Sequence, residues 1–142
     1  MREILFRGKR VSDGKWIYGY YNKCEALHNW KDERPEPRTW IQEVDESGVA
    51  LIFEPVDPAT VGQFTGLTDK NGKKIFEGDI LAMKGMEKLI IEGVVRYGTF
   101  NCTCCHGVYG WFVDGGDIRD AAYMCEVIGN IHDNPELLEV EK

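Results

Sequence analysis

The sequence predicts an all-β chain with one short helical turn near its carboxyl end. Apolar and polar residues alternate in short runs, and glycine, asparagine and proline separate these runs at the spacing of β-hairpins. The 3.6-residue periodicity of a long amphipathic helix is missing, so we expect no helix longer than about three turns. A chain of 142 residues with 43% apolar content is long enough to bury one core and a small second lobe.

A first lobe of β-hairpins is expected over residues 1–58. Its predicted strands are residues 4–6, 16–21, 39–41 and 49–53. Asp13-Gly14 turns the first hairpin, and Asp45-Glu46-Ser47-Gly48 turns the second. Residues 24–38 are polar and contain two prolines, which predicts a surface loop. Pro55 and Pro58 end the lobe because proline lacks the amide hydrogen that a strand ladder requires.

A small, strongly bent barrel is expected over residues 59–142. Its predicted strands are residues 61–67, 74–83, 89–97, 110–113 and 124–131. Their number, their length and the glycine-rich bends between them suit such a barrel. Asn134 as N-cap, Pro135 at the first helical position and the following Leu137-Leu138 predict a short terminal helix.

Residues 69–74 read Asp-Lys-Asn-Gly-Lys-Lys, which raises phosphate binding, metal binding and a hairpin bend as alternatives. Asp69 at the first position and Gly72 at the fourth fit a type I turn followed by a left-handed glycine. A two-residue Asn71-Gly72 turn is the close alternative. The string lacks the spacing and the following helix of a phosphate-binding loop, so we interpret it as the bend of a hairpin.

Glu77 and Asp79 are candidates for an acid and base pair, because residues two apart in a strand share one face. No histidine lies near them in sequence, and carboxylates in turns are usually structural. We expect Asp79 to accept hydrogen bonds from nearby backbone amides, with Ile80 or Leu81 reaching the core. The sequence therefore predicts no catalytic residues.

Five cysteines at irregular spacing fit reduced thiols in a cytosol better than a disulfide framework. A zinc site is the chemical alternative, with candidate ligands Cys102, Cys104, Cys105, His106 and Cys125. The pair Cys24 and His28 is a further source of ligands. The second spaced pair of a structural zinc site is missing, so we predict buried or idle thiols, no metal and no cofactor.

Aromatic residues are a further candidate for function, either as a stacking platform for bases or as a peptide groove. They are Trp16, Tyr18, Tyr20, Tyr21, Trp30, Trp40 and Trp111. Trp16, Tyr18 and Tyr20 alternate along one predicted strand and so share a face. Such residues serve equally well as core and as cross-strand pairs.

Net charge and hydropathy indicate which classes of partner the protein can bind. The chain has 17 basic and 24 acidic residues, a net charge of −7, which disfavours nucleic acid. Residues 1–40 hold 9 basic and 6 acidic residues, whereas residues 41–142 hold 8 and 18, and such opposed ends favour a homo-oligomer. No run approaches the ~20 apolar residues of a membrane helix, and no apolar signal core follows Met1, so we expect no membrane contact and a cytoplasmic protein.

Several segments together resemble the YopX family of phage and prophage proteins. They are residues 61–72, 75–80 and 127–138, with Arg2-Glu3-Ile4-Leu5-Phe6-Arg7 and Gly14-Lys15-Trp16 at the amino end. The resemblance implies a β-rich fold with an SH3-like barrel in the second half and a gene carried on phage or other mobile DNA. It brings no established activity and no catalytic residues. Residues 22–60 and 100–123 match only loosely, so we expect properties specific to this chain there.

From these observations we expect a non-enzymatic accessory protein of phage or mobile-element biology. It would act through self-association and through binding of a phage or host protein. A nucleic-acid binder that uses the basic residues 1–40 is one alternative, and an enzyme of unidentified chemistry is another.

Overall fold

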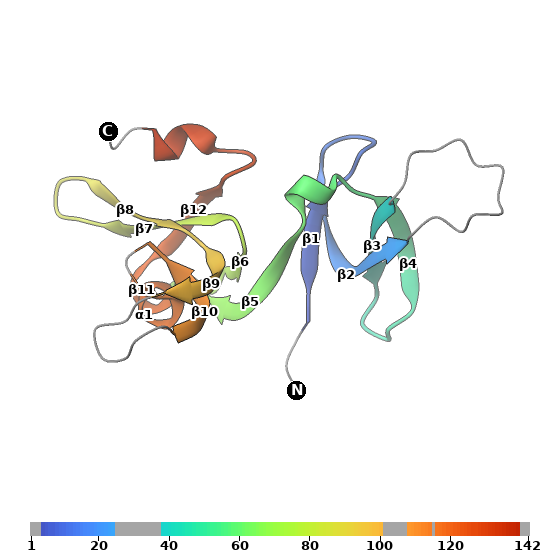
Figure 1. Ribbon diagram of the computed structural model, residues 1–142, viewed down its shortest axis with the longest axis horizontal. Helices are drawn as coiled ribbons and strands as arrows, with labels where there is room; N and C mark the ends of the chain where they lie inside the picture. The colour runs from blue at the N-terminus through green and yellow to red at the C-terminus, as the bar shows by residue number, and fades with distance from the viewer. Residues whose placement is uncertain (1–3, 25–37, 101–107, 115, 140–142) are drawn as a thin grey trace. The chain divides into compact units, whose positions relative to one another are not determined.

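The computed structural model describes residues 4–24, 38–100, 108–114 and 116–139 (Figure 1). The chain divides into two compact units, residues 1–63 and 64–142. The sequence placed the boundary after Pro58, whereas the division falls after Gln63, inside a strand. We describe each unit by itself.

Unit 1, residues 1–63, is an antiparallel sheet in the strand order β4-β3-β2-β1. Its strands are β1 (Phe6–Lys9), β2 (Trp16–Cys24), β3 (Arg38–Val44) and β4 (Ala50–Pro55). The 3-10 helix η1 (Pro58–Thr60) follows, and the start of β5 (Gly62–Thr68) pairs with β1. Ile17, Ile41 and Val56 form the buried core. The two predicted hairpins are present, although β1 begins at Phe6 rather than at Ile4.

Unit 2, residues 64–142, contains the rest of β5 and two three-stranded sheets, in the orders β12-β7-β8 and β11-β10-β9. The other strands are β6 (Lys74–Phe76), β7 (Asp79–Lys84), β8 (Leu89–Val94), β9 (Arg96–Phe100), β10 (Val108–Val113), β11 (Gly116–Asp117) and β12 (Glu126–Asn130). The helix α1 (Ile118–Met124) lies between β11 and β12 along the chain. The buried core of unit 2 includes Ile75, Leu81, Val95, Val113, Ile118 and Cys125.

The all-β class is confirmed, because strands dominate both units and helices are short. The predicted strand 74–83 is in fact two strands, β6 and β7, because the chain turns at Gly78 with a φ of +87°. The predicted strand 89–97 is likewise divided into β8 and β9. No sheet of the described residues closes on itself, so the SH3-like barrel stays a prediction.

The sequence does not predict α1 and instead predicts its last residue, Met124, as part of the strand 124–131. The helix has a clear start signal, since the Asp117 side chain accepts a hydrogen bond from the Arg119 N–H at 2.8 Å. The terminal helix is present as the 3-10 helix η2 (Pro135–Leu138). Among the described helices, none is long and apolar enough to cross a membrane.

Candidate functional site

The segment from Asp69 to Lys73 is a hairpin turn. The Asp69 N–H donates to the Lys73 carbonyl at 2.8 Å, and the Gly72 N–H donates to the Asp69 carbonyl at 3.0 Å. Gly72 has a φ of +82°, the left-handed conformation that the turn requires. Asp69 Oδ1 also accepts the N–H groups of Asn71 at 2.8 Å and Lys73 at 2.9 Å. The predicted type I turn with a left-handed glycine is therefore confirmed.

The second oxygen of the Asp69 carboxylate reaches a different strand. Oδ2 accepts the Val127 N–H of β12 at 2.9 Å, and the Lys70 N–H donates to the Cys125 carbonyl at 3.2 Å. Burial of Asp69 raises the pKa of this carboxyl, but the three backbone donors together outweigh burial and hold the pKa below its usual value. Both oxygens are occupied by backbone groups, so Asp69 fixes the hairpin to β12.

Glu77 and Asp79 do not lie on one face, so the geometry assumed for an acid and base pair is wrong. Gly78 reverses the chain between them, which leaves Glu77 exposed and Asp79 only 1% exposed. Asp79 Oδ2 accepts the Phe76 N–H at 2.8 Å across this turn. Ile80 and Leu81 are fully buried, as expected. Asp79 thus acts as the structural acceptor that the sequence predicted.

Four of the candidate zinc ligands, Cys102, Cys104, Cys105 and His106, lie outside the described residues. The fifth, Cys125, is 1% exposed and forms part of the core of unit 2. Burial raises the pKa of its thiol, and the negative charge of Glu92 raises it further. Within the part of the chain that the structure describes, no three or more His, Cys, Asp or Glu side chains are grouped to hold a metal.

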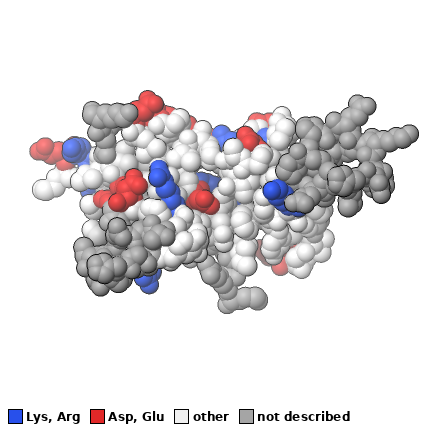
Figure 2. All heavy atoms as spheres, in the orientation of Figure 1, with Lys and Arg blue, Asp and Glu red and all other residues white. Residues whose placement is uncertain are grey.

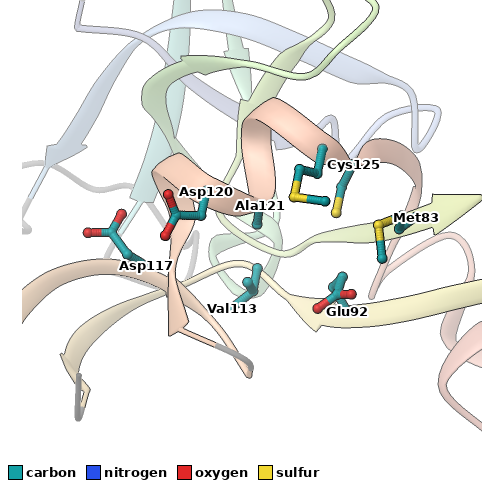
Figure 3. Close-up of a pocket in the computed structure, with 8 residues that line it drawn as sticks. Met83, Glu92, Val113, Asp117, Asp120, Ala121 and Cys125 are labelled. Atoms are coloured by element: carbon teal, nitrogen blue, oxygen red, sulfur yellow. The ribbon is translucent and has the colours of Figure 1, made fainter. Parts of the chain in front are cut away.

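A hollow of about 150 Å³ opens beside α1 in unit 2 (Figure 3). Its lining comes from α1 and the neighbouring strands: Met83, Glu92, Val113, Asp117, Asp120, Ala121, Met124 and Cys125. Asp117 is already engaged, because its two oxygens accept from the Arg119 guanidinium at 3.2 and 2.8 Å. That side-chain hydrogen bond is the main reason why the pKa of Asp117 is lowered. The lining thus combines the carboxylates of Glu92, Asp117 and Asp120 with the buried thiol of Cys125 and apolar side chains.

A second hollow, of about 300 Å³, is lined in unit 2 by aromatic and apolar residues together with Thr65, Asp117 and Arg119. Trp111 and Tyr109 project from β10, and Leu67 and Ile118 complete the apolar part. Tyr97 packs edge-on against both aromatic rings, with centroid distances of 5.0 Å to Tyr109 and 4.8 Å to Trp111. This hollow thus places an aromatic and apolar wall beside the charged side chains of Asp117 and Arg119.

Some aromatic side chains of unit 1 contact a cation or another ring, and others are exposed to solvent. The Arg7 guanidinium lies 4.6 Å from the centre of the Trp16 ring, and Tyr21 packs against Phe6. Tyr18 and Tyr20 are 44% and 51% exposed. Trp40 is half-buried. The predicted platform of Trp16, Tyr18 and Tyr20 is thus reduced to the two tyrosines, and Trp30 lies outside the described residues.

The two tyrosines belong to a larger apolar surface. Tyr20 is paired with Gln42, and Gln42 with Phe53, so Tyr20 and Phe53 lie on the same face, two strands apart. Phe53 is 58% exposed. We call Tyr18, Tyr20 and Phe53 the exposed face. The sequence indicated its tyrosines by their alternation but not Phe53, because the strand order is needed to place Phe53 on the same face.

The family model for YopX protein matches residues 5–139, nearly the whole chain. The chain belongs to the YopX family. A protein of the same fold is seen in the crystal structure of protein EF1440 from Enterococcus faecalis, with a TM-score of 0.55 and 23% identity over 97% of this chain and 99% of that chain. No curated protein matches this chain.

In the segments that carry the YopX resemblance, the polar side chains form hydrogen bonds that stabilise turns. Asn130 Oδ1 accepts the N–H groups of His132 at 3.0 Å and Asp133 at 2.9 Å, which closes the turn after β12. Gly129 is required there, because a Cβ would lie 2.5 Å from Asn134 Oδ1. Asn134 holds the N-cap position as predicted, but its side chain accepts from the Asn130 N–H at 3.3 Å instead of capping η2. These polar residues therefore hold turns together, and the surface candidates lie elsewhere.

Proposed function

We propose that this member of the YopX family is a non-enzymatic protein that acts through protein contacts, including contacts with other copies of itself. The observation that carries the proposal is the exposed face of unit 1, where Tyr20 is 51% and Phe53 58% exposed. Tyrosine and phenylalanine are enriched at protein interfaces because each buries a large, rigid area on contact. Leu51 lies in the same strand as Phe53, is 57% exposed and adds to the exposed apolar area.

The setting we propose is the cytoplasm of a cell that carries a phage or another mobile element, with a phage or host protein as the further partner. The resemblance to phage and prophage proteins supports the setting. The odd number of cysteines supports a reducing compartment, and Cys125 is buried without a disulfide.

A nucleic-acid partner is less well supported. Unit 1 has 9 basic and 11 acidic residues and unit 2 has 8 and 13, so each unit is net negative. The face drawn in Figure 2 shows the basic side chains of the described residues scattered among uncharged and acidic ones. Polyanion binding requires gathered positive charge. Counted by unit, the two net charges have the same sign, so we argue self-association from the apolar surface rather than from charge.

Light scattering across a concentration series tests the proposal. We expect the mass to rise above the 16.2 kDa of one chain at micromolar concentration. A double variant, Tyr20→Ser with Phe53→Ser, should weaken association at least tenfold, since aromatic residues at an interface core each contribute about 1–2 kcal/mol or more. Tyr123→Ser is the matched control, because Tyr123 is 85% exposed on α1 of the other unit. A wild-type chain that is monomeric at every concentration would overturn self-association.

A further inference from the structure

The edge of the unit 1 sheet is formed by β4, a strand that is apolar on both faces. Leu51, Ile52 and Phe53 are 57%, 39% and 58% exposed. Among the described residues, no strand pairs with the outer edge of β4; contacts on that side are the Val11 N–H on the Pro55 carbonyl and, just beyond β4, the bridge between Arg10 and Val56. Proteins commonly block such edges with lysine, but the only charged residue of β4 is Glu54. This edge therefore lacks the usual protection against strand pairing.

The hydrogen-bond phase of β4 shows which backbone groups face outward. The Val56 N–H donates to the Thr39 carbonyl at 3.0 Å, and β3 and β4 continue from there in the register Trp40↔Pro55 and Gln42↔Phe53. Bonded and non-bonded pairs alternate along an antiparallel ladder, so the N–H and C=O of Phe53 point away from β3. Pro55 has the same phase, and its carbonyl indeed accepts from Val11, outside β3, at 3.0 Å.

A second outward-facing residue lies at the other end of β4. The Asp45 N–H donates to the Val49 carbonyl at 3.0 Å, and Val44 is paired with Ala50, so the backbone groups of Ala50 also point away from β3. The register shifts between Glu43 and Val44, which leaves Leu51 and Ile52 at the irregularity. The free edge thus offers two residues, Ala50 and Phe53, whose N–H and C=O groups are directed to an incoming strand.

We propose that β4 pairs with β4 of a second copy in antiparallel orientation, which makes one continuous sheet across the two chains. This proposal rests on the self-association proposed above and names its surface. A two-fold axis close to residues 51–53 brings the same outward groups of both copies together, as an isologous contact requires. It places apolar side chains against apolar side chains and keeps the two Glu54 carboxylates from lying directly opposite each other.

The pairing is short, so the dimer is expected to be weak. Proline at position 55 has no N–H, and its carbonyl is already bound by Val11, which ends the ladder at that side. Only the stretch from Ala50 to Phe53 remains for the partner. An interface of this size depends on its few backbone bonds, and the Phe53 N–H is therefore the most informative group to remove.

Phe53→Pro removes this N–H and leaves the β3–β4 ladder intact, because β3 does not use it. Phe53→Ala is the matched control, since it removes the side chain and retains the N–H. We expect Phe53→Pro to weaken self-association at least tenfold, and Phe53→Ala to weaken it less. Equal losses in the two variants would show that side chains alone hold the copies together, and would overturn the edge pairing.

Two further measurements keep the test decisive if Phe53→Pro does not fold. Phe53→Lys should also weaken association at least tenfold, whereas Val49→Lys, at a 59% exposed turn residue, should not. In the wild type, hydrogen exchange at the Phe53 amide should slow as protein concentration rises. A wild type that associates while Phe53→Lys has no effect, and while Phe53 exchange stays independent of concentration, overturns the edge pairing alone. A wild type that never associates overturns the proposed self-association itself.

Discussion

Two hairpin turns, one in each unit, are built from the same pattern of residues. Asp45-Glu46-Ser47-Gly48 and Asp69-Lys70-Asn71-Gly72 both begin with aspartate and end with a glycine, whose φ is +86° in the first turn and +82° in the second. In both, one carboxylate oxygen accepts two backbone N–H groups, at 2.9 and 3.0 Å for Asp45 and at 2.8 and 2.9 Å for Asp69. The local chemistry of the two turns is therefore the same.

The turns differ in what lies beyond them. Asp69 Oδ2 accepts the Val127 N–H at 2.9 Å, and Asp69 is 6% exposed. The Asp45 turn makes only local contacts, such as the Ser47 hydroxyl at 2.6 Å, and it remains exposed. One turn joins three strands of a core, and the other only closes a hairpin whose second strand is the open edge β4. In this family member the Asp69 turn supports the core of unit 2, whereas the Asp45 turn leads into the exposed strand β4.

Replacing the two aspartates should give the largest difference in stability between the two turns. Asp69→Ala leaves three backbone N–H groups without their acceptor, one of them in another strand, and should lower the free energy of unfolding by about 2–3 kcal/mol. Asp45→Ala should cost clearly less, because water reaches the freed amides. Urea denaturation of the full chain measures both. Equal losses would mean that the Val127 contact contributes nothing.

The contribution of the Asp69 carboxylate to stability should depend on pH. The pKa of Asp69 is lowered from 3.8, so its ionised form stabilises the fold above the unfolded pKa, and this contribution is lost as the pH falls through the folded pKa. The stability difference between wild type and Asp69→Asn should thus be full near pH 7 and shrink below about pH 4. Thermal unfolding at several pH values tests this. A difference that stays constant down to the lowest pH would show that the ionised carboxylate is not the stabilising form.

The glycines should behave alike in the two turns. Gly48→Ala and Gly72→Ala each place a side chain in the left-handed region, which costs about 1–2 kcal/mol, and a Cβ at either position meets no atom within 4 Å. The two losses of unfolding free energy should therefore be similar, in contrast to those of the aspartates. A much larger loss for Gly72→Ala would show that the conformation of this turn is coupled to its contact with β12.

The sequence predicted both turns because Asp at the first position and Gly at the fourth determine their conformation locally. It did not predict the Val127 contact, which joins residues 58 positions apart. Nor did it place Phe53 on the same face as Tyr20, since both facts depend on strand order. The helix α1 was missed although Asp117 marked its start, because its seven residues are too few to show a helical periodicity. Local conformation is thus readable from residues, whereas edges and exposed faces require the topology.

The smallest effect is expected at the tip of the Asp69 turn. The Asn71 side-chain amide donates to Glu126 Oε2 at 3.1 Å, but this bond is exposed to water. Asn71→Ala should therefore change the free energy of unfolding by no more than about 0.5 kcal/mol. Glu126→Gln, which retains an acceptor, should change it still less. If Asn71→Ala approaches the loss caused by Asp69→Ala, the hairpin is held to β12 by its tip as much as by the buried carboxylate, and the distinction between the two turns would then depend on side chains at the surface.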